Sequence, residues 1–139
     1  MKSDIKNKLI AIVRVRGRVK VRGKTQETLD RLNLKKPNNC VVVRATDSYI
    51  GMINKANDYI AYGEVDNAIL DKILKKRGVP ISADELSNSP EKMAELKQHL
   101  PFRLKPPRRG YSKIKFSYVN HGSLGYMGKE INGLLARMI

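Results

Sequence analysis

Leu9-Ile10-Ala11-Ile12-Val13-Arg14-Val15 is an apolar run of strand length that is rich in β-branched residues. Its first five positions are apolar without interruption, and the last three alternate. Continuous apolar runs of this length are typical of a strand that is buried on both faces. We therefore expect a central strand here, and we expect it to end at the basic side chains that follow.

Beyond residue 24, apolar residues at helical spacing alternate with β-branched runs. The expected elements are a helix over 25–33, a strand over 39–43, a helix that is capped by Asp47 or Ser48 and includes Ala56, and a strand over 59–65. Residues 8–66 therefore predict a β-α-β-α-β unit of the α+β class, ferredoxin-like in part, in which a three-stranded sheet is backed by two helices on one face. Leu29, Leu32, Ile50 and Ile53 are expected to share the core beneath that sheet.

Residues 67–139 predict a helical and extended C-terminal extension of this unit. The expected elements are a helix over 67–77, short helices between 82 and 100, an extended proline-containing segment over 101–111, a glycine-punctuated loop over 122–128 and a final helix over 130–138. A chain of 139 residues with 41% apolar residues is the size of one ordinary domain. We therefore expect residues 1–139 to form a single domain.

The net charge of +15 is strongly segregated along the chain. Residues 1–24 hold nine basic side chains and one acidic, residues 25–95 hold ten basic and eleven acidic, and residues 96–129 hold eight basic and none acidic. Like charges crowded in this way repel each other unless counter-charges such as phosphates neutralise them. Nucleic acid is the first candidate partner. An anionic membrane is the second, but the chain has no Trp, no apolar run of 18 residues and no long basic amphipathic helix in these segments.

Arg16-Gly17-Arg18-Val19-Lys20-Val21-Arg22-Gly23-Lys24 is the densest basic series, and glycines bound it. Two other readings of it are an edge strand whose charges discourage aggregation and a dinucleotide-binding loop, although the glycine spacing does not suit the second. We expect RNA phosphates to bind here and at the basic and aromatic residues of the later segment. The candidate RNA-binding residues are Arg14, Arg16, Arg18, Lys20, Arg22, Lys24, Arg103, Lys105, Arg108, Arg109, Tyr111, Lys113, Lys115, His121, Tyr126 and Lys129.

Residues that carry chemistry are scarce. Cys40 is the single cysteine, so neither an internal disulfide nor a four-ligand zinc site is expected, and its apolar surroundings predict a buried, inert thiol. Asp58, Glu64 and Asp66 could be read as a metal-binding carboxylate cluster, but solvated or helix-capping roles explain them more simply. We expect no catalytic residues, no metal, no cofactor and no small-molecule substrate. The alternatives left open are an RNA-modifying enzyme and a protein that coats nucleic acid without specificity.

Six stretches, in this order, resemble one known family. They are Ile12-Val13-Arg14-Val15-Arg16-Gly17-Arg18; Asn39-Cys40-Val41-Val42-Val43; Asp47-Ser48-Tyr49-Ile50-Gly51-Met52; Asp58-Tyr59-Ile60 with Gly63-Glu64-Val65-Asp66; Phe102-Arg103-Leu104 with Pro106-Pro107-Arg108; and Leu124-Gly125-Tyr126 with Gly128-Lys129-Glu130-Ile131-Asn132. Together they are similar to the long archaeal form of the L-thirty family of ribosomal proteins, and they cover nearly the whole chain.

The resemblance implies a sheet with the strand order three, one, two, and a structural role in the large ribosomal subunit. The implied partners are large-subunit ribosomal RNA, 5S ribosomal RNA and neighbouring ribosomal proteins, and the implied location is the ribosome in the cytoplasm. Residues 8–66 would form the RNA-binding core and residues 67–139 the long-form extension. The family is not an enzyme family.

Overall fold

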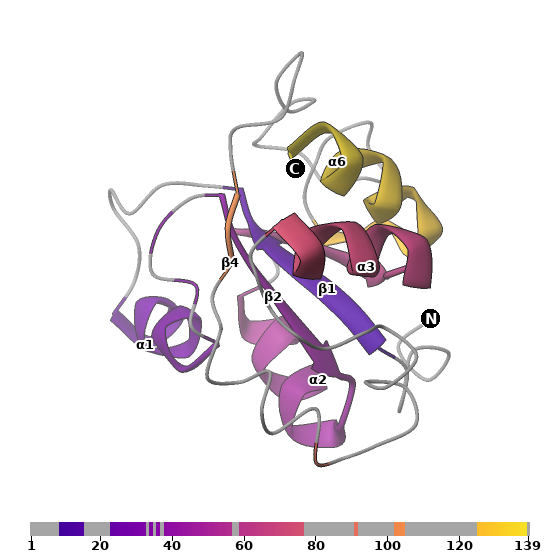
Figure 1. The fold of residues 1–139 in the computed structure, drawn as a ribbon. Helices are drawn as coiled ribbons and strands as arrows, with labels where there is room; N and C mark the ends of the chain where they lie inside the picture. The colour runs from indigo at the N-terminus through magenta and orange to yellow at the C-terminus, as the bar shows by residue number, and fades with distance from the viewer. Residues whose placement is uncertain are drawn as a thin grey trace.

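The computed structural model describes residues 9–15, 23–32, 34, 36, 38–56, 59–76, 91, 102–104 and 125–138. Its centre is a sheet in the order β4-β2-β1-β3-β5, of which Figure 1 labels β4, β2 and β1. β1 (Leu9–Arg14) pairs antiparallel with β2 (Asn39–Arg44) on one side and with β3 (Ile60–Glu64) on the other. The α+β class and the strand order three, one, two are therefore confirmed.

One face of the sheet is covered by α1 (Gly23–Arg31) and α2 (Asp47–Lys55). Because successive strand residues point to opposite faces, Ile10 and Ile12 of β1 both lie in this core. The core includes Leu29, Leu32 and Ile53, and the half-buried Ile50 packs against it, as the sequence predicted. Thr46, not Asp47 or Ser48, caps α2, because its hydroxyl accepts a 3.5 Å hydrogen bond from the Tyr49 amide.

The other face of the sheet is covered by α3 (Asn67–Lys76) and α6 (Ile131–Met138). Ala11 and Val13, the alternate residues of β1, lie in this second core. Figure 1 shows the sheet between the two pairs of helices. The sequence predicted helices on one face only, and the extension supplies the cover for the other. This explains why β1 is apolar at consecutive positions.

Two strands of two residues extend the sheet at its edges. β4 (Phe102–Arg103) pairs antiparallel with β2, and β5 (Gly125–Tyr126) pairs parallel with β3. The sequence predicted a loop around β5, and this was wrong for Gly125 and Tyr126. The short helices that were expected between 82 and 100 lie outside the described residues, apart from Glu91.

Two contacts hold the C-terminal helix against β3. One is made by the buried side-chain amide of Asn132, and the other is a close approach between the backbones of Gly63 and Gly128. The Asn132 side chain accepts a 2.8 Å hydrogen bond from the Asp66 amide and donates a 3.1 Å bond to the Glu64 carbonyl. Gly63 lies against the 3-10 turn η3 (Gly128–Glu130), where a Cβ atom would collide with the carbonyl oxygen of Gly128. Both contacts join residues far apart in the sequence, so they fix the extension against the core.

Candidate nucleic-acid interface

The basic stretches 16–22 and 105–124 attach to the same end of the sheet. A single row of paired residues crosses all five strands, in the order Phe102, Cys40, Val13, Ala61, Gly125. Beyond this row the chain continues from β1 to Val15, which residues 16–22 follow. It continues in the same direction from β4 to Leu104, which residues 105–124 follow. Residues 105–124 lead back into the sheet at Gly125, the first residue of β5. We call this side of the row the basic end of the sheet.

Backbone hydrogen bonds tie the described residues at the basic end together. The Val15 amide donates to the Tyr59 carbonyl at 2.9 Å, and the Asn38 amide donates to the Arg14 carbonyl at 2.8 Å. The Asn38 carbonyl accepts a 3.2 Å bond from the Leu104 amide. Asn38 has a φ of 68°, in the left-handed region that Asn tolerates better than most residues. The points at which the basic segments leave the sheet are therefore held in place relative to each other.

Arg14, which the sequence analysis counted among the candidate RNA-binding residues, is buried beneath α1. Its side chain has 0% exposure. Its guanidinium donates a 2.7 Å hydrogen bond to the Leu34 carbonyl and a 3.3 Å bond to Gln26 Oε1. Through these two bonds Arg14 joins β1 to α1 and to the residues that follow α1.

The structure describes four of the other candidate residues, each to a different extent. Lys24 is exposed in the first turn of α1. The backbones of Arg103, Tyr126 and Lys129 lie in β4, β5 and η3 respectively. The remaining candidates lie outside the described residues: Arg16, Arg18, Lys20, Arg22, Lys105, Arg108, Arg109, Tyr111, Lys113, Lys115 and His121. Their contacts with RNA stay predictions.

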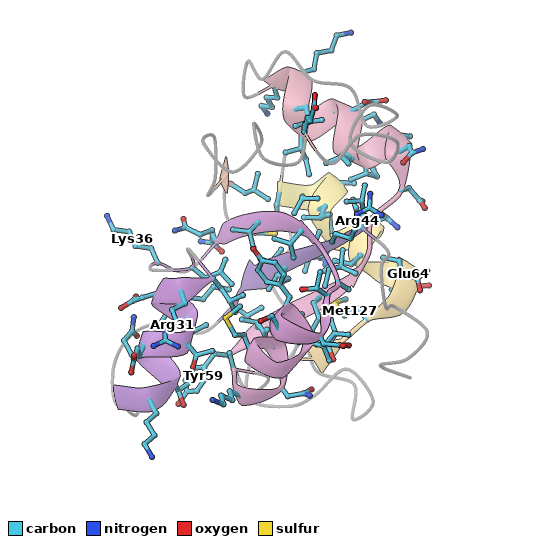
Figure 2. The ribbon with its side chains drawn as sticks, turned by 90° about the horizontal axis from the view of Figure 1, so that it is seen from below. Arg31, Lys36, Arg44, Tyr59, Glu64 and Met127 are labelled. Carbon is cyan, nitrogen blue, oxygen red and sulfur yellow. The ribbon has the colours of Figure 1, made fainter. Side chains whose placement is uncertain are left out.

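Among the residues that the structure describes, sequence reasoning overlooked three exposed cations near the basic end: Arg31, Lys36 and Lys55. Lys36 lies just before Asn38, and Figure 2 shows its side chain pointing away from the body of the molecule. Arg31 lies on α1 and Lys55 in the last turn of α2. They occur in the stretch 25–95, whose basic and acidic residues nearly balance. Only their position in the fold therefore identifies them as part of a basic surface. Arg44 and Glu64 lie at the opposite end of the sheet, as their pairing with Leu9 and Ile10 requires.

Groups suited to chemistry are not assembled within the described part of the chain. Burial raises the pKa of the Cys40 thiol from 9.0 to about 12, which leaves no nucleophilic thiolate at neutral pH. Among the described residues no group of three or more His, Cys, Asp or Glu side chains could hold a metal ion. The suggested cluster of Asp58, Glu64 and Asp66 is described only for its last two members. Within the same residues, no helix combines the length and the apolar character needed to cross a membrane.

Comparison with known proteins identifies the family. The model of the family described as Ribosomal protein L30p/L7e matches residues 10–60. The large ribosomal subunit proteins uL30 of Methanoregula boonei and Methanocorpusculum labreanum are each 40% identical to this chain, over 94% of it and 99% of their own length. The uL30 protein of Methanococcus vannielii is 37% identical over 93% of the chain and 98% of its own length. The match thus extends well past the core into the extension, and the chain belongs to the uL30 family of large ribosomal subunit proteins.

Proposed function

We propose that this chain is a structural protein of the large ribosomal subunit that binds and stabilises large-subunit ribosomal RNA through the basic end of its sheet. The observation that carries the proposal is the near full-length similarity to archaeal proteins named as large ribosomal subunit proteins. These relatives are named as proteins of the large ribosomal subunit, and we propose no catalysed reaction for the chain. In this role it resides in the cytoplasm, within the ribosome.

The charge distribution and the fold support the same role. The basic stretches 16–22 and 105–124 are far apart in the sequence, and the strands that lead into and out of them meet at one end of the sheet. Folded RNA presents closely spaced phosphates, and each basic side chain that neutralises one of them releases counterions. A surface built in this way gains affinity from the RNA backbone and needs no pocket for a small molecule.

We further propose that residues 1–139 act as a single RNA-binding domain, with 8–66 as its core. Its additional partners would be 5S ribosomal RNA and neighbouring ribosomal proteins. The basis for these finer assignments is the family resemblance of the six sequence stretches, together with the cationic residues over 105–129.

The test is the association of the tagged chain with ribosomal particles in its own cells. We expect it to sediment with large subunits in one-to-one stoichiometry and to stay bound through a moderate salt wash. Ultraviolet cross-linking of the purified particles should then place its contacts on large-subunit RNA, and on 5S RNA if the finer proposal holds. Recovery with DNA and RNA of all kinds, lost at moderate salt, would instead identify a non-specific coating protein.

A further inference from the structure

A hollow of about 480 Å³ lies along α1, next to Lys55 in the last turn of α2. It is lined by Lys24, Thr25, Glu27, Thr28, Arg31 and Lys55, and we call it the α1 hollow. Only Lys24 was among the RNA-binding residues expected from the sequence. Two helices that contact each other therefore bring together side chains that are 31 positions apart in the chain.

The α1 residues of the hollow occupy one face of the helix. Lys24, Thr28 and Arg31 are spaced i, i+4 and i+7, and such residues lie above one another on an α-helix. The helical rise separates Lys24 from Arg31 by about 10 Å along the axis. Thr28 is buried, and its hydroxyl donates a 2.9 Å hydrogen bond to the Lys24 carbonyl, so it forms the floor. The cationic side chains form the exposed rim.

The rim carries three positive charges and one negative charge. Lys24, Arg31 and Lys55 are exposed, and Arg31 donates a 2.7 Å hydrogen bond to Glu27, which leaves a net charge of about +2 by formal counting. A guanidinium has five N–H donors in a planar fork, so one contact with Glu27 leaves donors for a second acceptor. Three cations around a shallow hollow favour an anion, because its charge relieves their mutual repulsion.

The hollow adjoins the basic end of the sheet. Lys24 comes immediately after segment 16–22 and the first helical residue, Gly23. Lys55 precedes Tyr59, whose carbonyl accepts the hydrogen bond from Val15 at the end of β1. A polyanion that is bound at the basic end can therefore continue along α1 into the hollow.

We infer that the α1 hollow binds the sugar-phosphate backbone of the same large-subunit RNA. Lys24 and Lys55 donate to phosphate oxygens, and Arg31 divides its donors between Glu27 and a phosphate. The span of about 10 Å along α1 exceeds what one phosphate group covers, so the ligand is a strand of RNA and not a free phosphate. Such contacts fix the position of the RNA and do not read its bases. This inference rests on the proposed function, because it assumes that the chain binds this RNA.

The test measures the acetylation of individual lysines in the unmodified chain, free and bound to large-subunit RNA, by mass spectrometry. Lys24 and Lys55 should be protected in the complex. Lys72, Lys75 and Lys76 are the internal control, because they are exposed on α3, which covers the other face of the sheet. Equal acetylation of Lys24 and Lys55 in the free and bound chain would overturn the inference while leaving the proposed function intact. A chain that fails to bind the RNA at all would overturn both.

A pair of charge-matched variants gives a second readout. K24Q/R31Q/K55Q removes three charges from the hollow, and K72Q/K75Q/K76Q removes three from α3. The first should lower the slope of log affinity against log salt by about 2–3, since each lost phosphate contact contributes about 0.7–0.9, and the second should leave it nearly unchanged. Equal effects of the two variants would show that net charge alone matters and would overturn the inference. So would protection of Lys24 and Lys55 that appears only when a neighbouring ribosomal protein is added, because the occupant would then be an acidic protein surface.

Discussion

Arg14 is a cation that lies inside the core of the protein. It occupies the same face of β1 as Ile10 and Ile12, and this face lies beneath α1. Its guanidinium bonds to the Leu34 carbonyl and to Gln26, and Gln26 in turn donates a 2.9 Å bond to Asp30. The buried charge is therefore connected through one amide side chain to a carboxylate at the surface, which compensates for part of its desolvation.

Arg14→Met should reduce stability without affecting RNA binding. The variant keeps much of the side-chain volume but leaves the buried Leu34 carbonyl without this donor, which costs about 1–3 kcal/mol. Urea denaturation measures the loss, and Arg31→Met, at an exposed position of α1, should stay within about 0.5 kcal/mol of the original chain. If Arg14→Met retained full stability and lowered the salt slope of RNA binding, Arg14 would be a phosphate contact after all.

The Cys40 thiol should make a distinct contribution to stability at high pH. Its pKa is about 12 in the folded chain and 9.0 for an ordinary thiol, so the folded state holds the proton more tightly. This contribution is fully present below pH 9 and is lost as the pH rises from 9 towards 12, by up to about 1.4 kcal/mol per pH unit. The measurement is the difference between the original chain and Cys40→Ala across that range, because other titrating groups cancel in the difference. A native thiol that reacts with a reagent as fast as the unfolded chain would contradict the assignment.

At the scale of single residues, the sequence predicted the burial of Cys40 but not that of Arg14, for related reasons. Cys40 lies in an uninterrupted apolar run, and such a run predicts burial whichever face a residue occupies. Arg14 begins a basic series, so its charge predicted an exposed side chain. The alternation of side chains between the two faces of β1 was not applied to it. Had that pattern been extended by one step from Ile12, it would have placed Arg14 in the core.

The elements depend on contacts between segments that are distant in sequence, and Gly63 is the clearest case. Gly63→Ala should destabilise the fold by about 1–3 kcal/mol, because its Cβ meets the Gly128 carbonyl and overpacking forces the backbone to shift. Gly133→Ala is the matched control, since a Cβ at this exposed position of α6 meets nothing within 4 Å. It should stabilise the chain by about 0.4–1 kcal/mol through its effect on helix propensity and on the unfolded chain. Thermal unfolding of both variants checks the prediction, and equal effects would mean that η3 does not press against β3.

A substitution at Leu32 measures the contribution of the core between the sheet and the helices α1 and α2. It has 2% exposure just past the end of α1, where it packs in the cluster that includes Ile10 and Ile53. Leu32→Ala should therefore cost about 2–5 kcal/mol, from lost burial and the cavity that remains. A loss below about 1 kcal/mol in urea denaturation would place this side chain at the surface.

The three long strands and most helices could be predicted at the element scale because each carries its own periodicity over several residues. β4 and β5 could not, because two residues are too few for a pattern. The pairing of α6 with β3 depends on Asn132, whose partners Glu64 and Asp66 are 68 and 66 positions away. Nothing local to Asn132 indicates that its amide is buried, so which helix covers which face had to come from the structure.

At the scale of the whole molecule, the sequence predicted that two basic segments bind a polyanion, and the fold shows where they attach. Val15, Leu104 and Gly125, which flank the basic stretches 16–22 and 105–124, lie at the basic end of the sheet. The strand order that brings them together came from the family resemblance, because spacing alone does not determine strand order. Most of the predicted RNA-binding side chains lie outside the described residues, and the α1 hollow was not predicted because its charges are dispersed along a nearly neutral stretch.

The central claim is that RNA phosphates bind at the basic end of the sheet, and the most direct test replaces Arg16, Arg18 and Arg22 with Ala. The measurement is the salt dependence of binding to large-subunit ribosomal RNA, with K72Q/K75Q/K76Q on α3 as the control that removes equal charge. We predict an unfolding temperature close to that of the original chain and a slope of log affinity against log salt that is lower by about 2–3, with little change for the control. An unchanged slope in a well-folded triple variant would contradict the claim.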